Sequence, residues 1–491
     1  MILFLTILIP IISGLILPVL KLNENFRKIY VSIFTLITSI ITYFIFFSEE
    51  IYFIKLLTIN EIFSLSFSCD GLSKIFCLLV ATLWPLATLY AFDYMKHEGD
   101  EDSFFRYYMI AFGITLGVSF SNNLITMYLF YELLTFLTLP LIMHKKEEKS
   151  SLYAGKVYLI LSIFGATLAL IGIIILTMQT QTTDFIYGGY LSSNLLIDNK
   201  SLLYIGYGLC FLGFGVKAAI LPFSFWLPVC SVAPTPVTAL LHAVAVVKAG
   251  VFAIMRVTFY SYGFEFLQNT VVQNVCMVIT ICTILYGSIM AVKETNLKRR
   301  FAYSTVSNLS YILFAILLLT AEGLSSAITH MIFHGIIKIT IFLVIGAILI
   351  YTGSTEVKDV KNYAKYMKWT FLTFTIASLA LIGIPLTCGF ISKFAIAEAA
   401  IANGSKIAII GLISIVLSSI LTAIYTFTII VNAYFPTLIK DNSNTTNAQL
   451  DIKDPSIYML IPFIILIIMI IYFGISSAPL VDFINNVAFG L

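Results

Sequence analysis

Long, continuous apolar runs alternate with short polar segments along the whole chain. Each run is about 20 residues long, the length a helix needs to cross the hydrocarbon core of a bilayer. Strands of a membrane barrel would instead alternate apolar and polar residues with a period of two. The pattern therefore predicts an all-α polytopic membrane protein with about fourteen transmembrane helices. The predicted spans are, approximately, 1–20, 29–47, 71–93, 104–120, 123–143, 152–177, 201–227, 234–260, 271–292, 301–320, 325–350, 369–399, 406–434 and 456–476.

The amino-acid composition indicates the same class. Hydrophobic residues make up 60% of the 491 residues and charged residues only 11%, whereas a soluble globular chain carries about 25% charged residues. Such a chain cannot form a soluble surface, so we expect the lipid bilayer to surround it. The net charge of +3 is too small to indicate a nucleic-acid partner.

The polar segments between the runs differ in charge. Basic residues are concentrated in every second loop, and the intervening loops contain only Lys55, Lys200 and Lys406. Because basic loops remain on the cytoplasmic side, this alternation predicts an even number of spans, with both termini on the outer side of the cell (inner) membrane. The first run has no basic segment before it and no small-residue cleavage site, so we interpret it as a retained span.

No sequence pattern indicates a cofactor. The seven cysteines form no CxxC pair, and most of them lie in apolar runs, so they indicate neither an iron–sulfur cluster nor a zinc site. The sequence has no Walker motif and no GxGxxG motif that opens a helix, which disfavours nucleotide binding. We expect no cofactor and no bound metal, and any redox chemistry would have to take place in a partner.

Ionisable residues inside the apolar runs are the candidate functional groups, because a charge in the membrane core is costly. Glu132 lies in the middle of a run, Lys217 and Lys248 each lie well inside one, and His242 precedes Lys248 by six residues. A lone lysine can extend its ammonium group to the membrane surface, and Glu132 could form a structural ion pair with a lysine. A buried pair whose partners can separate would also act as a switch.

A row of three bases lies in the stretch THMIFHGIIKITIF. His330, His334 and Lys338 are four residues apart, so they project from one face of a helix. Two histidines at this spacing could bind zinc, but no glutamate lies between them and no third ligand is near in sequence. They could also be packing histidines that bond to carbonyl groups. Because imidazole both accepts and donates protons near neutral pH, we favour a proton relay.

Prolines interrupt two of the runs that contain a lysine. Pro222 and Pro228 interrupt the run of Lys217, and Pro385 interrupts the run of Lys393. Broken helices at corresponding places in two halves of a chain are typical of ion paths in inverted-repeat transporters. The fourth to eighth and the ninth to thirteenth spans would form two five-helix repeats. An odd number of crossings per repeat makes the second repeat inverted relative to the first.

This layout predicts four parts of the chain. Residues 1–103 would contain the first three spans, 104–260 the first repeat, 261–434 the second inverted repeat, and 435–491 a loop and the last span. Residues 440–454 are predicted to form a polar loop.

Four stretches of the chain resemble one family of membrane subunits. They are KAAILPFSFWLPVCSVAPTPVTALLHAVAVVKAGVFAIMR, KETNLKRRFAYSTVSNLSYI, ITHMIFHGIIKITIFLVIGA and GIPLTCGFISKF. They are similar to the proton-translocating, antiporter-like subunits of respiratory complex I, Mrp-type sodium/proton antiporters and energy-converting membrane hydrogenases. The resemblance extends over most of the chain and implies two broken helices, the seventh and the twelfth.

The resemblance also implies a proton path along the middle of the membrane. Glu132 and Lys217 match the family's fifth-helix glutamate and seventh-helix lysine, and Lys393 matches the terminal base of the twelfth helix. Some members have glutamate at that last position. The complete implied path consists of Glu132, Lys217, Lys248, His242, His330, His334, Lys338 and Lys393.

The implied function is translocation of protons, with sodium as the alternative ion, by one subunit of a larger complex. The subunit itself would not be catalytic, and its partners would be other membrane subunits, further antiporter-like subunits among them, and a peripheral redox module. That complex would be a redox-driven ion translocase, NADH dehydrogenase-like or an energy-converting hydrogenase. One alternative is a subunit of a sodium/proton antiporter without a redox partner. Another is a stand-alone solute transporter, which the line of charges disfavours because such a transporter needs a central cavity.

Overall fold

The computed structural model describes residues 1–50, 52–58, 63–191, 199–435 and 452–490. Most of the predicted polar loop, at 440–451, lies outside these residues. The described chain is mostly helical, as predicted. Its α-helices are α1 (Ile2–Leu20), α2 (Glu24–Phe47), α3 (Gly71–Tyr94), α4 (Glu101–Ser119), α5 (Leu124–Ile142), α6 (Lys149–Thr180), α7 (Lys200–Lys217), α8 (Trp226–Val229), α9 (Thr235–Ala243), α10 (Val246–Met255), α11 (Phe264–Leu267), α12 (Val271–Lys293), α13 (Leu297–Leu317), α14 (Ala321–Thr352), α15 (Lys368–Ile382), α16 (Cys388–Asn403), α17 (Lys406–Tyr434), α18 (Ile457–Ile475) and α19 (Ala478–Ala488).

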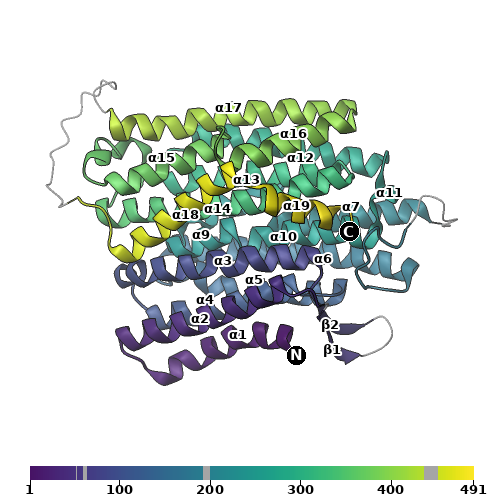
Figure 1. Cartoon of the computed structure of the whole chain (residues 1–491), viewed down its shortest axis with the longest axis horizontal. Helices are drawn as coiled ribbons and strands as arrows, with labels where there is room; N and C mark the ends of the chain where they lie inside the picture. The colour runs from purple at the N-terminus through teal and green to yellow at the C-terminus, as the bar shows by residue number, and fades with distance from the viewer. Residues whose placement is uncertain (51, 59–62, 192–198, 436–451, 491) are drawn as a thin grey trace.

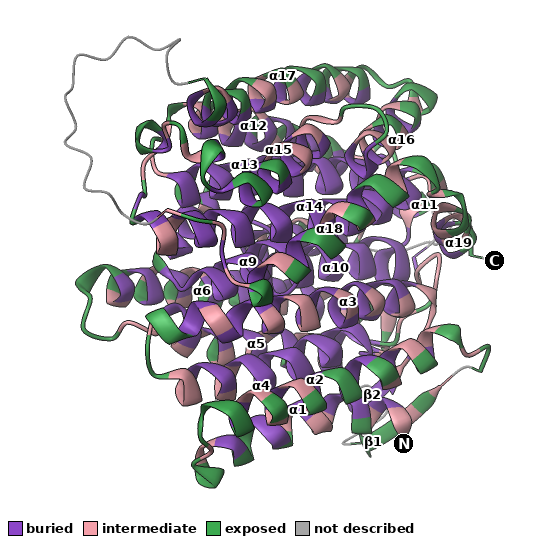
Figure 2. Cartoon of the chain, turned by 60° about the vertical axis from the view of Figure 1, so that its left-hand side comes forward, coloured by how far each residue is buried: buried purple, intermediate pink, exposed green. Residues whose placement is uncertain are grey.

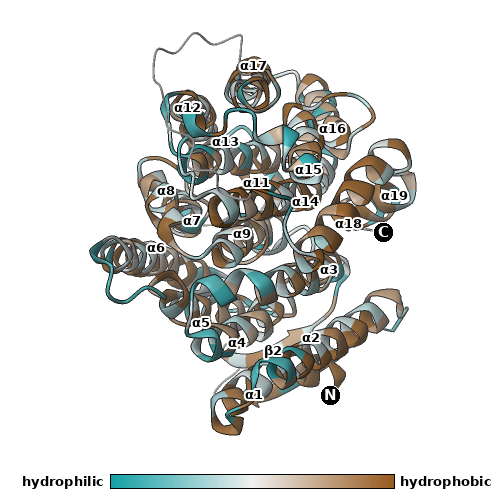
Figure 3. Cartoon of the chain, turned by 90° about the vertical axis from the view of Figure 1, so that its left-hand side faces the viewer, coloured by the Kyte–Doolittle hydropathy of each residue, from teal (hydrophilic) through white to brown (hydrophobic). Residues whose placement is uncertain are grey.

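The long helices lie side by side in one layered bundle, with α1 at one edge and α17 at the opposite edge (Figure 1). Viewed along the helices, α14 lies at the centre (Figure 3). It packs against α3, α9, α13, α15, α16, α18 and α19. Nearly all residues of α14 are buried, whereas α17 exposes a row of large apolar side chains (Figure 2). An apolar outer surface around a core that contains charged groups suits a chain surrounded by lipid.

Ten helices in the described part of the chain are long and apolar enough to cross a membrane. They correspond to ten of the spans predicted from the sequence. These helices are Ile2–Leu20, Glu24–Phe47, Gly71–His97, Leu124–Ile142, Lys149–Thr180, Thr235–Tyr262, Val271–Lys293, Ala321–Thr352, Lys406–Tyr434 and Ile457–Ile475.

One element departs from the prediction that the chain is all-α. Strand β1 (Phe53–Thr58) pairs antiparallel with strand β2 (Ser64–Ser68). The pairing continues into the segment after α4, because the Ser68 amide donates to the Phe120 carbonyl at 2.8 Å. Asn123 adds side-chain hydrogen bonds to Ser64 and Ser66. These segments are too short to span a bilayer, and a search for long apolar runs therefore overlooked them.

Three pairs of helices are broken where a continuous span would be expected. The α7 helix ends at Lys217, and short helical turns cover 223–232 before α9 begins. Residues 383–387 separate α15 from α16, and Val244 and Ala245 separate α9 from α10. The first two breaks contain the prolines identified from the sequence. The third contains neither proline nor glycine, and the sequence did not predict it.

Candidate functional site

The first pair of charges lies between α5 and the break that follows α7. The Lys217 ammonium is buried at the last residue of α7, and its Nζ lies 3.8 Å from Glu132 Oε1. This separation is an ion pair but is longer than a hydrogen bond. Lys217 donates instead to the Tyr131 carbonyl and lies 3.3 Å from the centre of the Tyr131 ring. The lysine therefore has a second partner while Glu132 stays only loosely attached.

The Glu132 side chain lies on the outward face of α5. Its side chain is 17% exposed, and the exposed residues Leu129 and Phe136 lie one helical turn to either side of it. Its Oε1 atom is buried, with no hydrogen-bond partner among the described residues. A carboxylate that faces lipid near the middle of a span is costly. Water or another protein subunit would have to cover this position.

The second group of residues lies at the break between α9 and α10. Both Val244 and Ala245 donate their amides to the Leu240 carbonyl, which ends α9. On the other side of this break, α14 approaches so closely that a side chain in place of Gly335 would lie 3.1 Å from the Ala243 carbonyl oxygen. The break thus lies directly against the helix that carries the three bases.

The break also separates two residues that the sequence placed on one helix. His242 belongs to α9, and Lys248 belongs to the first turn of α10. His242 stacks on the Phe342 ring with 4.4 Å between the ring centres, and neither of its ring nitrogens is hydrogen-bonded within the described residues. Lys248 Nζ lies 2.9 Å from His334 Nδ1. Lys248 therefore connects α10 to α14, and His242 does not take part in that contact.

The three bases of α14 lie on one helix, as their spacing predicts. All three are buried, within about 10 Å of the midpoint of the helix at 1.5 Å per residue. The rings of His330 and His334 are 5.7 Å apart between centres. Metal ligands are not gathered here, since no group of three or more histidine, cysteine, aspartate or glutamate side chains is found in the described ranges.

Each base of α14 contacts a different neighbouring helix. His334 contacts Lys248 of α10, and His330 Nδ1 lies 2.9 Å from the Ser392 hydroxyl of α16. Lys338 turns toward α13, where it donates to the Ser304 hydroxyl at 2.7 Å and to the Phe301 carbonyl at 3.0 Å. The resemblance implied the order His330, His334, Lys338, Lys393. In the structure His330, rather than Lys338, contacts the helix that carries Lys393.

Lys393 lies in α16, just beyond the break that contains Pro385. Its half-buried ammonium donates to the carbonyls of Leu381 and Ile382 at 2.7 and 3.0 Å. These are the last carbonyls of α15, which lose their helical partners at the break. A third bond, of 3.0 Å, goes to the Ser419 hydroxyl of α17. The lysine thus donates hydrogen bonds to the carbonyl groups that the break leaves without helical partners.

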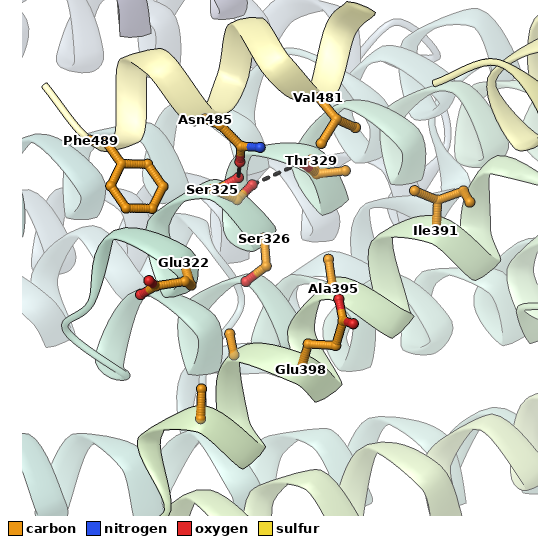
Figure 4. Close-up of a pocket in the computed structure, with 12 residues that line it drawn as sticks. Glu322, Ser325, Ser326, Thr329, Ile391, Ala395, Glu398, Val481, Asn485 and Phe489 are labelled. Carbon is orange, nitrogen blue, oxygen red and sulfur yellow. Dashed lines mark hydrogen bonds between the residues drawn. The ribbon is translucent and has the colours of Figure 1, made fainter. Parts of the chain in front are cut away.

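A pocket of about 350 Å³ with a mixed polar and apolar lining lies where α14, α16 and α19 meet (Figure 4). Glu322, Ser325 and Thr329 of α14 face Glu398 of α16 across it. Asn485 of α19 closes one side and accepts a hydrogen bond of 2.5 Å from Ser325. Thr329, which lines the pocket, directly precedes His330 in the sequence.

Sequence reasoning missed several residues of this site, because uncharged serines carry no signal by themselves and because the partner of a charged residue can be far away in sequence. Ser392 and Ser304 bond His330 and Lys338, and the proximity of Ser392 to Lys393 in sequence was the only available signal. Arg256 was part of a recognised motif, but its partner Asp70 is far away in sequence. Their nitrogen and oxygen atoms are 2.5 and 2.7 Å apart, and this pair ties the start of α3 to the end of α10.

Residues 121–422 match the family described as NADH:quinone oxidoreductase/Mrp antiporter, TM. The chain belongs to this family. The matched segment runs from the start of α5 into α17 and so includes Glu132, Lys217, Lys248, the bases of α14 and Lys393. The resemblance seen in the sequence motifs is therefore confirmed at the level of the family.

Curated relatives in the family are similar over nearly the whole chain. A Na(+)/H(+) antiporter subunit A1 of Staphylococcus haemolyticus is 30% identical over 514 aligned residues, which cover 96% of this chain and 61% of the relative. A Na(+)/H(+) antiporter subunit A1 of Staphylococcus aureus is 29% identical, with 98% of this chain and 62% of the relative covered. The chain thus spans about three fifths of the length of these relatives.

Three solved structures share the fold. A chain of the archaeal membrane-bound sulfane sulfur reductase superposes with a TM-score of 0.86 at 23% identity and covers 99% of this chain and 96% of its own length. A chain of the Mrp complex from Dietzia sp. DQ12-45-1b gives 0.83 at 19% identity, with 100% and 97% covered. A chain of respiratory complex I from Thermus thermophilus gives 0.80 at 19% identity, with 99% of each chain covered. At these identities the likeness concerns the fold.

Proposed function

We propose that this chain translocates protons, with sodium as the alternative ion, across the cell membrane as one subunit of a larger complex. The observation that carries this proposal is the line of titratable side chains through the middle of the bundle. It starts at Glu132 and Lys217, continues through Lys248 and His334, and reaches Lys393 by way of His330 and Ser392. Buried ionisable groups in a membrane protein mark ion pathways because their cost must be offset by function.

The chemistry of the first pair suits a switch. At 3.8 Å the Glu132 carboxylate favours the charged form of Lys217, and its withdrawal favours release of the proton. Lys217 retains the Tyr131 carbonyl when the carboxylate moves, so its ammonium has a partner in either arrangement. Movement of the Glu132 carboxylate would then favour protonation or deprotonation of the next base in the line.

The proposed architecture has fourteen spans in two inverted five-helix repeats. Ten helices satisfy the criteria of length and hydropathy, and we add four further crossings. They are α4, α7 together with its continuation to 232, α13, and α15 together with α16. The proposed parts are 1–103, 104–260, 261–434 and 435–491, and the alternation of basic loops supports termini on the outer side.

The partners we propose are other membrane subunits, further antiporter-like subunits among them. The partial exposure of the Glu132 side chain supports this proposal, because a second protein on the outward face of α5 would shield it from lipid. The similar Staphylococcus proteins are named Na(+)/H(+) antiporter subunits, which favours a sodium/proton antiporter without a redox partner as the main alternative assembly. The structural likeness to the sulfane sulfur reductase and complex I chains favours a complex with a peripheral redox module.

The test is transport by the assembled complex in membrane vesicles. We expect Lys248→Ala to abolish proton movement, because it removes the link between α10 and His334. Lys156→Ala is the matched control, since Lys156 is an exposed lysine on α6. Measurements with and without sodium would identify the ion. Normal proton and sodium transport by an assembled Lys248→Ala complex would exclude the proposed path.

A further inference from the structure

Hydroxyl side chains line the inward face of α17, at the edge of the bundle where it packs against α12 and α13 (Figures 1 and 3). Ser414, Ser418, Thr422 and Thr426 are four residues apart, and Tyr425 lies beside them. All five are buried. The row is absent from the path implied by the family resemblance, and none of its members is ionised at neutral pH.

One end of the row connects to Lys338. The Lys338 ammonium donates to Ser304 Oγ at 2.7 Å, and Ser304 Oγ lies 2.6 Å from Tyr425 Oη. Tyr425 Oη donates in turn to Thr422 Oγ1 at 3.3 Å. If Ser304 donates to Tyr425, every bond in this series points the same way, from Lys338 toward the middle of α17. A series of hydroxyls in one direction can pass a proton stepwise, because each oxygen both accepts and donates.

The next turn of α17 connects to Lys393. The Lys393 ammonium donates to Ser419 Oγ at 3.0 Å. The adjacent Ser418 hydroxyl belongs to a cluster with Ser288 and Tyr311, at 2.5 Å from each. One helical turn of about 5.4 Å separates Thr422 from Ser418. No direct hydrogen bond joins the Thr422 and Ser418 hydroxyls among the described residues, because Thr422 donates to the Ser418 carbonyl. The series therefore needs one water molecule, held by polar partners, to bridge these two hydroxyls.

We propose that α17 carries a hydroxyl relay, formed by Ser304, Tyr425, Thr422 and the Ser418–Ser419 turn, that connects Lys338 to Lys393. The inference rests on the proposed function and deepens it. Lys338 bonds α13 and forms no hydrogen bond with α16 within the described residues, so α17 supplies that connection. Each hydroxyl takes up one proton and releases its own, so a proton leaves the Lys338 ammonium, a neutral Lys393 amine accepts one, and the hydroxyls are unchanged.

A purely structural role is the alternative. Hydroxyl groups also hold membrane helices together through interhelical hydrogen bonds, and Thr422 bonds the Ser418 carbonyl of its own helix at 2.8 Å. The relay and the structural role predict different effects of substituting Thr426, which lies one turn further along α17. Thr426 is equally buried, but among the described residues its hydroxyl bonds only the carbonyls of Thr422 and Ala423. It therefore lies outside the relay and provides a matched control.

The experiment compares Tyr425→Phe, Thr422→Val and Thr426→Val in the assembled complex in vesicles. We expect the first two variants to slow initial proton transport at least about tenfold, because a proton-transfer step is lost. The ratio of rates in H₂O and D₂O should also rise in these two variants, since proton transfer then limits the rate. We expect Thr426→Val to transport normally, and Thr422→Ser, which keeps the hydroxyl, to restore the rate.

Two outcomes would overturn the relay. The first is equal loss of assembled complex in Thr422→Val and Thr426→Val, which would show that these hydroxyls only hold the helices together. The second is normal transport and a normal isotope ratio in Tyr425→Phe and Thr422→Val. Lys338→Ala then separates the two proposals. An inactive Lys338→Ala variant would support the proposed ion path through the bases and exclude only the relay. Normal transport by this variant would also exclude Lys338 from the proposed ion path.

Discussion

Lys217 and Lys393 both lie beside a broken helix, but they differ in burial and in the groups that contact the ammonium. Lys217 is the last residue before its break, is fully buried, and has a carboxylate at 3.8 Å. Lys393 follows its break, is half-buried, and has two carbonyls and a hydroxyl as partners. Within the described residues it forms no ion pair. A lysine with a movable countercharge responds to that charge, whereas the ammonium of Lys393 is held by two carbonyl dipoles and a hydroxyl.

The two breaks would therefore have different parts in the proposed path. Lys217 would be loaded and discharged by Glu132, and Lys393 would exchange its proton with water on one side of the membrane. The pocket at the meeting point of α14, α16 and α19 is lined in part by residues of α16, the helix that carries Lys393. The following variants test whether the difference between the two lysines is functional.

The largest effect is expected at the first break. Glu132→Gln and Lys217→Ala should each reduce ion transport by about a hundredfold or more, because each removes one of the two charges of the proposed switch, and the loss of one partner of a buried pair costs about 3–5 kcal/mol. Initial transport rates in vesicles, at matched amounts of complex, would measure this. Glu265→Gln, at an exposed carboxylate, is the control. Near-normal transport in either variant would show that the pair is not a switch.

At the second break we expect the outcome to depend on which residue replaces Lys393. Lys393→Leu should lower transport by about a hundredfold, since a proton-transfer group is lost. Lys393→Glu should retain part of the rate, because another titratable group stands at the same place. The corresponding Lys217→Glu variant should be inactive, since it places two carboxylates together. Equal loss in Lys393→Glu and Lys393→Leu would contradict proton exchange at this position.

A smaller effect, on stability, is expected from filling the close contacts at the breaks. A methyl group at Gly389 would lie 1.8 Å from the Ala380 carbonyl oxygen, and one at Gly250 would lie 2.8 Å from the Ala218 nitrogen. Gly389→Ala should therefore destabilise the protein more than Gly250→Ala, by about 1–3 kcal/mol. Thermal unfolding of the complex in detergent would rank the two variants. A larger loss of stability in Gly250→Ala than in Gly389→Ala would mean that the close contact at the first break tolerates an added methyl group less well.

The smallest effect is expected from Pro385→Ala. Gly383 adopts a positive φ of 95°, and the close approach at Gly389 also holds this break. The loss of proline should cost about 0.5–1 kcal/mol of stability, mostly through the unfolded chain, and should change transport by less than about twofold. Transport and unfolding measured on the same sample would test this. A large loss of transport would show that the proline itself maintains the break.

The sequence predicted the mostly helical membrane fold from its long apolar runs, and it named the charged members of the candidate site because each is a single ionisable residue in apolar surroundings. Long apolar runs predicted the helices, and the spacing of His330, His334 and Lys338 predicted their common face. The break at Val244 and Ala245 could not be predicted, because neither residue is a helix breaker and the neighbouring α14 helix is part of its environment. For the same reason, the sequence placed His242 and Lys248 on one helix.

The polar partners of the bases were equally inaccessible to sequence reasoning. Serine and threonine are common in membrane helices and bond the carbonyl of the preceding turn, so Ser304 or Thr422 carries no signal alone. Their relevance comes from the helices that face them. The hairpin of β1 and β2 was missed for another reason, since its strands are far shorter than a membrane span.

The central position of α14 also has a consequence for how the protein is made. The helices that cover its bases from one side, α15, α16 and α18, follow it in the chain. During synthesis α14 therefore enters the membrane before these neighbours exist, with His330 still lacking Ser392 of α16. A polar group exposed to lipid is tolerated only until a neighbouring helix packs against it. The proposed ion path would therefore be completed late in biogenesis, after the segment from α15 to α18 has been inserted.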